Sequence, residues 1–120
     1  MMVVGTGEAW AVDAYGCDPA RLRSIPDLGA VFAAVVADVP LSPLAPPVWH
    51  AFPEPGGVTG FLLLKESHLS VHTFPERGFA AFDLYCCRER TTWGWETRLK
   101  ALLGATRVVV RGIRRGGDDV

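Results

Sequence analysis

The segment Ser67-His68-Leu69-Ser70-Val71-His72-Thr73-Phe74 decides the fold of this chain, because polar and apolar residues alternate along it. The apolar Leu69 and Val71 fall on one side of an extended strand. The other side carries the polar and aromatic residues His68, Ser70, His72 and Phe74. Pro75-Glu76-Arg77-Gly78 follows as a predicted turn, and Phe79 to Cys87 is the partner strand. The segment therefore predicts a pair of strands with one covered face.

The partner strand repeats the alternation and gives the pair a polar side. Its apolar side consists of Phe82, Leu84 and Cys86. The opposite side of the two strands together carries His68, Ser70, His72, Asp83, Tyr85 and Cys87. Such a set suits a cleft or a second copy of the chain better than bulk water. We therefore expect a dimer, with the functional site near the seam between the two sheets.

Outward from this pair, the chain alternates between strands and helices. Apolar residues recur at helical spacing from Asp27 to Pro40, and a second amphipathic helix runs from about Trp95 to Gly104. Cys17-Asp18-Pro19 is predicted to be a turn or a brief helical start. The other predicted strands are Glu8 to Tyr15, a short strand at Val48 and Trp49, Val58 to Leu64, and Arg107 to Ile113. This order predicts an α+β fold, a two-layer α/β sandwich in which one mostly antiparallel sheet carries two helices on one face.

Length and charge limit the classes of function. A chain of 120 residues, 49% of them hydrophobic, has the length and the apolar content of a single domain, residues 1–120, with one core. The formal charge is −1, from 12 basic and 13 acidic residues. Because acidic and basic residues nearly cancel, the chain has no strong positive electrostatic field to attract a polyanion. We therefore expect no nucleic-acid partner.

Cysteine spacing and hydropathy limit the compartment. Cys17, Cys86 and Cys87 lack the spacing of a zinc site or of a disulfide framework, so no metal is expected. No leader pattern and no apolar run of membrane-spanning length occurs, so no membrane partner is expected. These features favour a reducing cytoplasm.

The dipeptide Glu66-Ser67 suits a chain that cuts itself. The Ser67 hydroxyl can attack the Glu66 carbonyl, and an imidazole can take the Cα proton of Ser67 while the resulting ester is eliminated. His72 is the candidate base. The expected products are a chain of residues 1–66 and a chain whose first residue, derived from Ser67, is a pyruvoyl group.

Three blocks and their spacing are specific enough to identify a family. They are Gly57-Val58-Thr59-Gly60, Glu66 to Glu76, and Asp83-Leu84-Tyr85-Cys86-Cys87. From Gly7 to about Gly116 the chain resembles the bacterial single-domain S-adenosylmethionine decarboxylases, which are self-cleaving proenzymes. The resemblance implies an α/β sandwich, a homodimer of processed units, and a pyruvoyl cofactor derived from Ser67. It also implies that S-adenosylmethionine is decarboxylated to the aminopropyl donor of polyamine and spermidine synthesis.

The resemblance also assigns roles to single residues. Thr59 matches the Ser/Thr position that assists cleavage by hydrogen-bonding the cyclic intermediate. Cys87 matches the acid that returns a proton to the substrate α-carbon after CO₂ leaves, and the pyruvoyl ketone would bind the substrate amine as a Schiff base. Phe52 and Phe74 match the aromatic pair that sandwiches adenine, and Glu76 matches the carboxylate that binds the ribose hydroxyls.

Two alternatives remain open. Arg88 stands where the family usually has glycine, and Cys86 replaces a usual threonine, so a related pyruvoyl-dependent decarboxylase of arginine or ornithine is the first alternative. Retention of Phe74 and Glu76 favours the nucleoside substrate. The second alternative is an unprocessed, non-catalytic binding or regulatory homologue. The self-processing set Thr59, Glu66, Ser67 and His72 argues against it.

Overall fold

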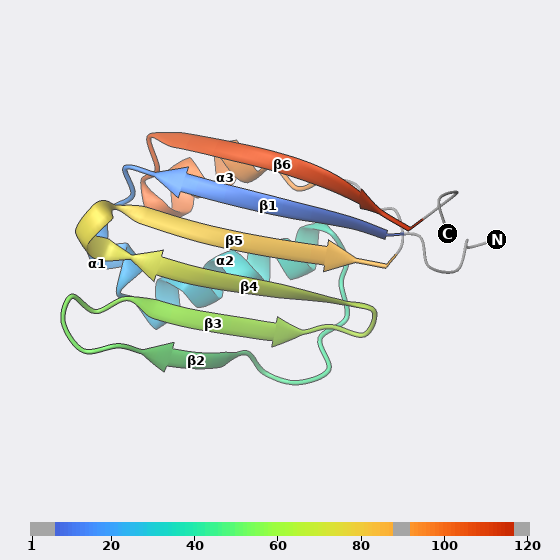
Figure 1. The fold of residues 1–120 in the computed structure, drawn as a ribbon. Helices are drawn as coiled ribbons and strands as arrows, with labels where there is room; N and C mark the ends of the chain where they lie inside the picture. The colour runs from blue at the N-terminus through green and yellow to red at the C-terminus, as the bar shows by residue number, and fades with distance from the viewer. Residues whose placement is uncertain (1–6, 88–91, 117–120) are drawn as a thin grey trace.

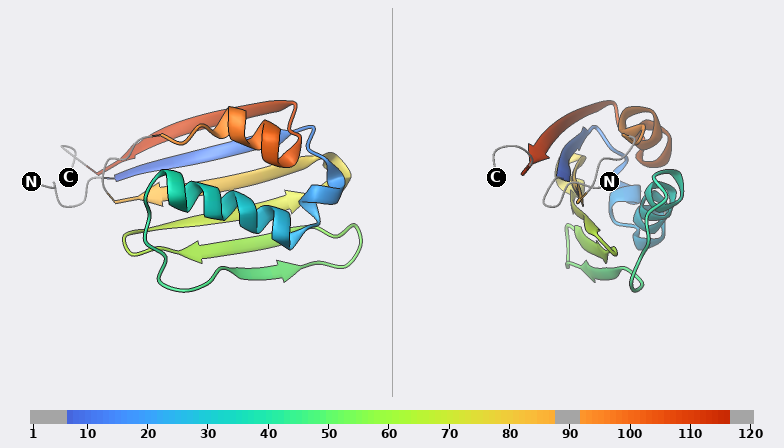
Figure 2. Two further views of the ribbon diagram at one scale, coloured as in Figure 1. Left: turned by 180° about the vertical axis from the view of Figure 1, so that it is seen from behind. Right: turned by 90° about the vertical axis from the view of Figure 1, so that its right-hand side faces the viewer.

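The computed structural model describes residues 7–87 and 92–116, which form one antiparallel sheet covered by helices on one face (Figures 1 and 2). The strands are β1 (Gly7–Tyr15), β2 (Val48–Ala51), β3 (Val58–Leu63), β4 (Ser67–Phe74), β5 (Phe79–Cys86) and β6 (Arg107–Arg115). The helices are α1 (Pro19–Leu22), α2 (Ile25–Asp38) and α3 (Trp95–Leu103), and Pro75–Arg77 forms a short 3₁₀ turn, η1. The predicted α+β sandwich is thereby confirmed.

The strands follow the order β2-β3-β4-β5-β1-β6, and every neighbouring pair is antiparallel. The predicted hairpin of β4 and β5 lies at the centre, with Val71 opposite Phe82 and Leu69 opposite Leu84. β1 pairs with both β5 and β6, so the N-terminal strand separates the hairpin from the last strand (Figure 1). The sheet is therefore wholly antiparallel in the described part of the chain, where a mostly antiparallel one was expected.

Helix α2 begins two residues before the predicted start. The Ser24 side chain caps it by accepting a hydrogen bond from the Asp27 backbone N–H, at 3.1 Å. Its last residue is Asp38, two residues before Pro40. One face is buried against the sheet through Leu28, Val31, Phe32 and Val35.

The predicted brief helical start after Cys17 is α1, where the Asp18 carboxylate accepts from the Ala20 N–H at 2.9 Å.

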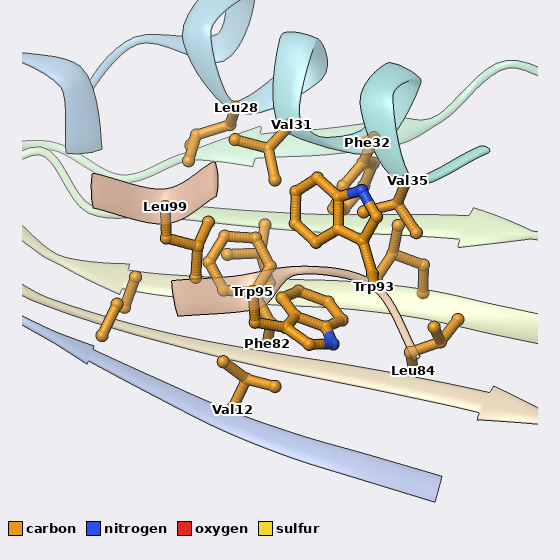
Figure 3. Close-up of a cluster of buried hydrophobic side chains, with 14 of the residues drawn as sticks. Val12, Leu28, Val31, Phe32, Val35, Phe82, Leu84, Trp93, Trp95 and Leu99 are labelled. Carbon is orange, nitrogen blue, oxygen red and sulfur yellow. The ribbon is translucent and has the colours of Figure 1, made fainter. Parts of the chain in front are cut away.

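Helix α3 ends at Gly104, as predicted, because Gly104 takes the left-handed conformation with φ of 71° that closes many helices. Its buried residues are Trp95, Leu99 and Leu103, whereas Leu102 is only partly buried. Trp95 packs on Phe82 of the sheet and Trp93 packs edge-on against Trp95. Figure 3 shows these rings and the α2 residues filling the space between helices and sheet.

Within the described residues, the other face of the sheet carries no helix (Figure 2). The predicted polar side chains of β4 and β5 lie on this open face, because Leu69, Val71, Phe82 and Leu84 occupy the covered one. None of the helices in residues 7–87 and 92–116 has both the length and the apolar character of a membrane-spanning segment. The same residues hold no group of three or more His, Cys, Asp or Glu placed to bind a metal ion.

Candidate active site

The Glu66-Ser67 junction lies where a tight connection from β3 enters β4. Leu64 donates its backbone N–H to the Ser67 carbonyl at 2.9 Å, and Lys65 donates to the Ser42 carbonyl at 2.8 Å. The Cys87 N–H donates to the Glu66 carbonyl at 3.2 Å. The residues on either side of the Glu66–Ser67 peptide bond are thus held by hydrogen bonds, and the carbonyl of that bond itself accepts one from Cys87.

Two adjacent cysteines lie beside this junction, of which Cys87 is the predicted proton donor. Cys86 is fully buried and directly opposite Ser67 in the β4–β5 register. Cys87 is only partly buried, and its Sγ donates to Glu66 Oε1 at 3.1 Å. The predicted opposite parity of the two cysteines is therefore what the structure shows. Arg88, which the sequence marks as unusual, lies outside the described residues.

A second group of predicted residues gathers at the far end of β4, around a cleft of about 420 Å³. His72 and Thr59 face each other across β4 and β3, with 3.0 Å between His72 Nδ1 and Thr59 Oγ1. Phe74 ends β4, and Glu76 follows in η1. The full lining is Phe52, Pro53, Glu54, Pro55, Gly57, Thr59, His72, Thr73, Phe74 and Glu76.

Two aromatic rings are exposed at this cleft. Phe52 is 51% exposed and Phe74 is 40% exposed, although both are large apolar side chains. His50 packs edge-on against Phe52 with ring centroids 4.5 Å apart, and Phe79 lies 5.8 Å from Phe74. Each ring is thus supported from one side while it lines the cleft, as a stacking surface for a planar ligand requires.

Thr73, to which the sequence motifs assign no role, fixes the cleft to the rest of the fold. Its side chain is 5% exposed, and its Oγ1 donates to the Leu22 carbonyl of α1 at 2.8 Å. The same oxygen accepts from the Val58 N–H of β3 at 2.9 Å. The sequence did carry a signal for this role, because Thr73 lies on the apolar side of an alternating strand. A hydroxyl buried on that side needs hydrogen-bond partners.

The structure does not bring the two groups together within one chain. Ser67 opens β4, and His72 lies five residues further along the same strand. At a rise of about 3.4 Å per residue, the two are separated by roughly 17 Å. Ser67, Glu66 and Cys87 therefore form one half of the predicted site, and Thr59, His72, Phe74, Glu76 and Phe52 form the other half.

Between the halves, the open face carries a polar hollow of about 490 Å³. His68 lies between the rings of Phe61 and Tyr85, at centroid distances of 5.8 and 5.9 Å. Burial raises the pKa of Asp83 above its usual value, and the nearby His72 and His68 partly oppose that rise.

Cys17 is buried among apolar core residues, outside both halves, and burial raises the pKa of its thiol to about 11.

Comparisons with known proteins agree with the fold and with the motif blocks. Residues 8–116 match the sequence profile of a family described as S-adenosylmethionine decarboxylase. An S-adenosylmethionine decarboxylase proenzyme of Sulfurihydrogenibium is 40% identical over 92 residues, which are 75% of this chain and 68% of that protein. One of Parasynechococcus marenigrum is 44% identical over 87 residues, which are 71% of this chain and 65% of that protein.

A solved structure is similar over nearly the whole chain. The crystal structure of the adenosylmethionine decarboxylase from Aquifex aeolicus superposes with a TM-score of 0.76 at 25% sequence identity. The superposition covers 96% of this chain and 94% of that one. The sheet and its helices thus have the architecture of that enzyme.

Proposed function

Because the chain belongs to the S-adenosylmethionine decarboxylase family, we propose that it cuts itself before Ser67 and decarboxylates S-adenosylmethionine with the pyruvoyl group so formed. The product is the aminopropyl donor for polyamine synthesis. The observation that carries the proposal is the Glu66-Ser67 junction, half-buried at the start of β4 with Cys87 beside it.

The local geometry supports the first step of self-cleavage. Ser67 Oγ attacks the Glu66 carbonyl carbon, and the Glu66–Ser67 amide becomes an ester while the nitrogen takes a proton. The Cys87 N–H that already donates to the Glu66 oxygen stabilises the negative charge that develops there. Removal of the Ser67 Cα proton then expels the main-chain carboxylate of Glu66 and leaves dehydroalanine at position 67. Water displaces ammonia from the dehydroalanine and leaves the pyruvoyl ketone.

Pairing of two chains supplies the base for this elimination. The His72 imidazole of the same chain is roughly 17 Å away along β4. If two open faces pack with their β4 strands running in opposite directions, the Ser67 end of one chain meets the His72 end of the other. The open face offers apolar area for such packing, because Phe61 is 41% exposed and Leu63 is 49% exposed. We therefore assign the working unit as a homodimer with two composite sites.

The cleft residues suit the nucleoside part of the substrate. Phe52 and Phe74 present ring faces to adenine, and the Glu76 carboxylate accepts hydrogen bonds from the ribose hydroxyls. A pyruvoyl group, once formed, supplies an electron sink for decarboxylation of a substrate held through its amine. The Cys87 thiol then delivers a proton to the substrate α-carbon, and Glu66, which accepts from Sγ, holds it in place.

The decisive experiment combines mass and turnover. A denaturing intact-mass spectrum is expected to show two chains, residues 1–66 and a pyruvoyl-blocked chain from position 67. The processed protein is expected to release labelled CO₂ from carboxyl-labelled S-adenosylmethionine in preference to arginine or ornithine. An uncut chain would contradict the self-cleavage, whereas faster release from arginine or ornithine would contradict only the choice of substrate.

Cys87→Ala is expected to self-cleave normally and to lose about 10²-fold or more in the rate of decarboxylation, the usual contribution of a positioned general acid. Cleavage survives because the alanine keeps the backbone N–H that donates to Glu66. Cys86→Ala should lose much less, since its thiol is buried in the core. Intact mass and CO₂ release measure the two steps separately. An equal loss of turnover in both variants would show that the donor is misassigned.

A further inference from the structure

The connection between β2 and β3 forms a closed loop at the edge of the cleft. The Phe52 N–H donates to the Gly57 carbonyl at 2.8 Å, and the Gly56 N–H donates to the Pro53 carbonyl at 2.9 Å. Arg23, which follows α1, donates its side-chain Nε to the Pro55 carbonyl at 3.0 Å. The loop is therefore fixed internally and is also fastened to the helical layer.

Glu54 occupies the tip of this loop, between Pro53 and Pro55. Each proline ring fixes its own φ, and a following proline restricts the backbone of the residue before it. Glu54 is thus held between two stiff residues while it lines the cleft. Little backbone freedom remains to be lost when a ligand binds beside it.

The charge at the cleft is negative. Glu54 and Glu76 both line it, and its lining includes no lysine and no arginine. In the described part of the chain, neither carboxylate forms an ion pair. The faces of Phe52 and Phe74 add the negative potential of aromatic rings. The two carboxylates and the two ring faces of the lining thus favour a cation.

We infer that Glu54 is a specificity-determining residue that selects a nucleoside with a positively charged sulfur over its neutral thioether counterpart. The inference rests on the proposed function, since it concerns the substrate of that site. A sulfonium centre has no N–H or O–H to donate, so a carboxylate can act on it only through charge. Glu76 is not expected to select between the two nucleosides, because the ribose hydroxyls that donate to its carboxylate are the same in both.

The test compares a charged and a neutral ligand in Glu54→Gln, which keeps the shape of the side chain and removes its charge. The KM for S-adenosylmethionine is expected to rise about 3- to 5-fold at low salt with kcat unchanged, as for an exposed charge pair worth up to about 1 kcal/mol. The inhibition constant of 5′-methylthioadenosine, a neutral thioether nucleoside, is expected to stay constant. Added salt should shrink the difference in KM, because the Debye length is about 10 Å at 0.1 M.

The matched control is Glu96→Gln, which makes the same change of net charge in α3, where Glu96 pairs with Lys100 and lies outside the cleft. It should leave both constants unchanged. An unchanged KM in Glu54→Gln, or an equal weakening of both nucleosides, would overturn the role of Glu54 as a charge selector. A wild-type protein that does not act on S-adenosylmethionine would instead refute the proposed function, so the two failures are distinguishable.

Discussion

Ser67→Ala is expected to abolish both chain cleavage and decarboxylation. Alanine has no oxygen to attack the Glu66 carbonyl, and it leaves no precursor of the pyruvoyl ketone. The loss should be complete, because no other residue at the junction can supply both the nucleophile and the carbon skeleton of the cofactor. Intact mass should give one uncut chain, and borohydride, which reduces a ketone, should leave its mass unchanged.

Ser42→Ala is the matched control for this variant. Ser42 is exposed, and its backbone carbonyl accepts a hydrogen bond from the Lys65 N–H of the same connection. The control makes the same chemical change beside the junction and keeps that hydrogen bond, so it should cleave at the wild-type rate. A cleaved and borohydride-sensitive Ser67→Ala protein would refute the assignment of the cofactor to Ser67.

His72→Ala is expected to slow self-cleavage by about 10²- to 10⁴-fold when it is expressed alone, the usual contribution of a general base. Co-expression with Ser67→Ala should restore cleavage. In the mixed dimer, the intact Ser67 of the His72→Ala chain meets the intact His72 of its partner. Mass tags on the two chains should show that only the His72→Ala chain is cut, and sedimentation should show that the cut protein is dimeric.

The control partner carries both substitutions, Ser67→Ala and His72→Ala. It offers the same surface for pairing and brings no imidazole, so it should not rescue cleavage. Two results would contradict the composite site: no cleavage in the mixture with Ser67→Ala, or rescue by the doubly substituted partner. Circular dichroism of each uncut protein separates these outcomes from a failure to fold.

The sequence by itself determined which residues face the core and which residues are candidates for catalysis. The alternation in Ser67–Phe74 predicted that Leu69 and Val71 would face the core and His72 the opposite side, and the structure has them so. Helical periodicity likewise predicted the buried Leu28, Phe32 and Leu99. These features depend on the direction of successive side chains along a single element, which is a local property of the backbone.

Only the tertiary structure decided which elements are neighbours and how far apart the predicted site residues lie. The placement of β1 between β5 and β6, and the hydrogen bonds of Thr73 to Leu22 and Val58, join residues far apart in the chain. Periodicity carries no information about such pairing. The division of the predicted site also follows from the tertiary structure. Ser67 and His72 are five residues apart in the motif, and because that segment is an extended strand they are separated by roughly 17 Å. A β-strand can separate residues that are close in sequence, and this separation is the reason for proposing that a second chain completes the site.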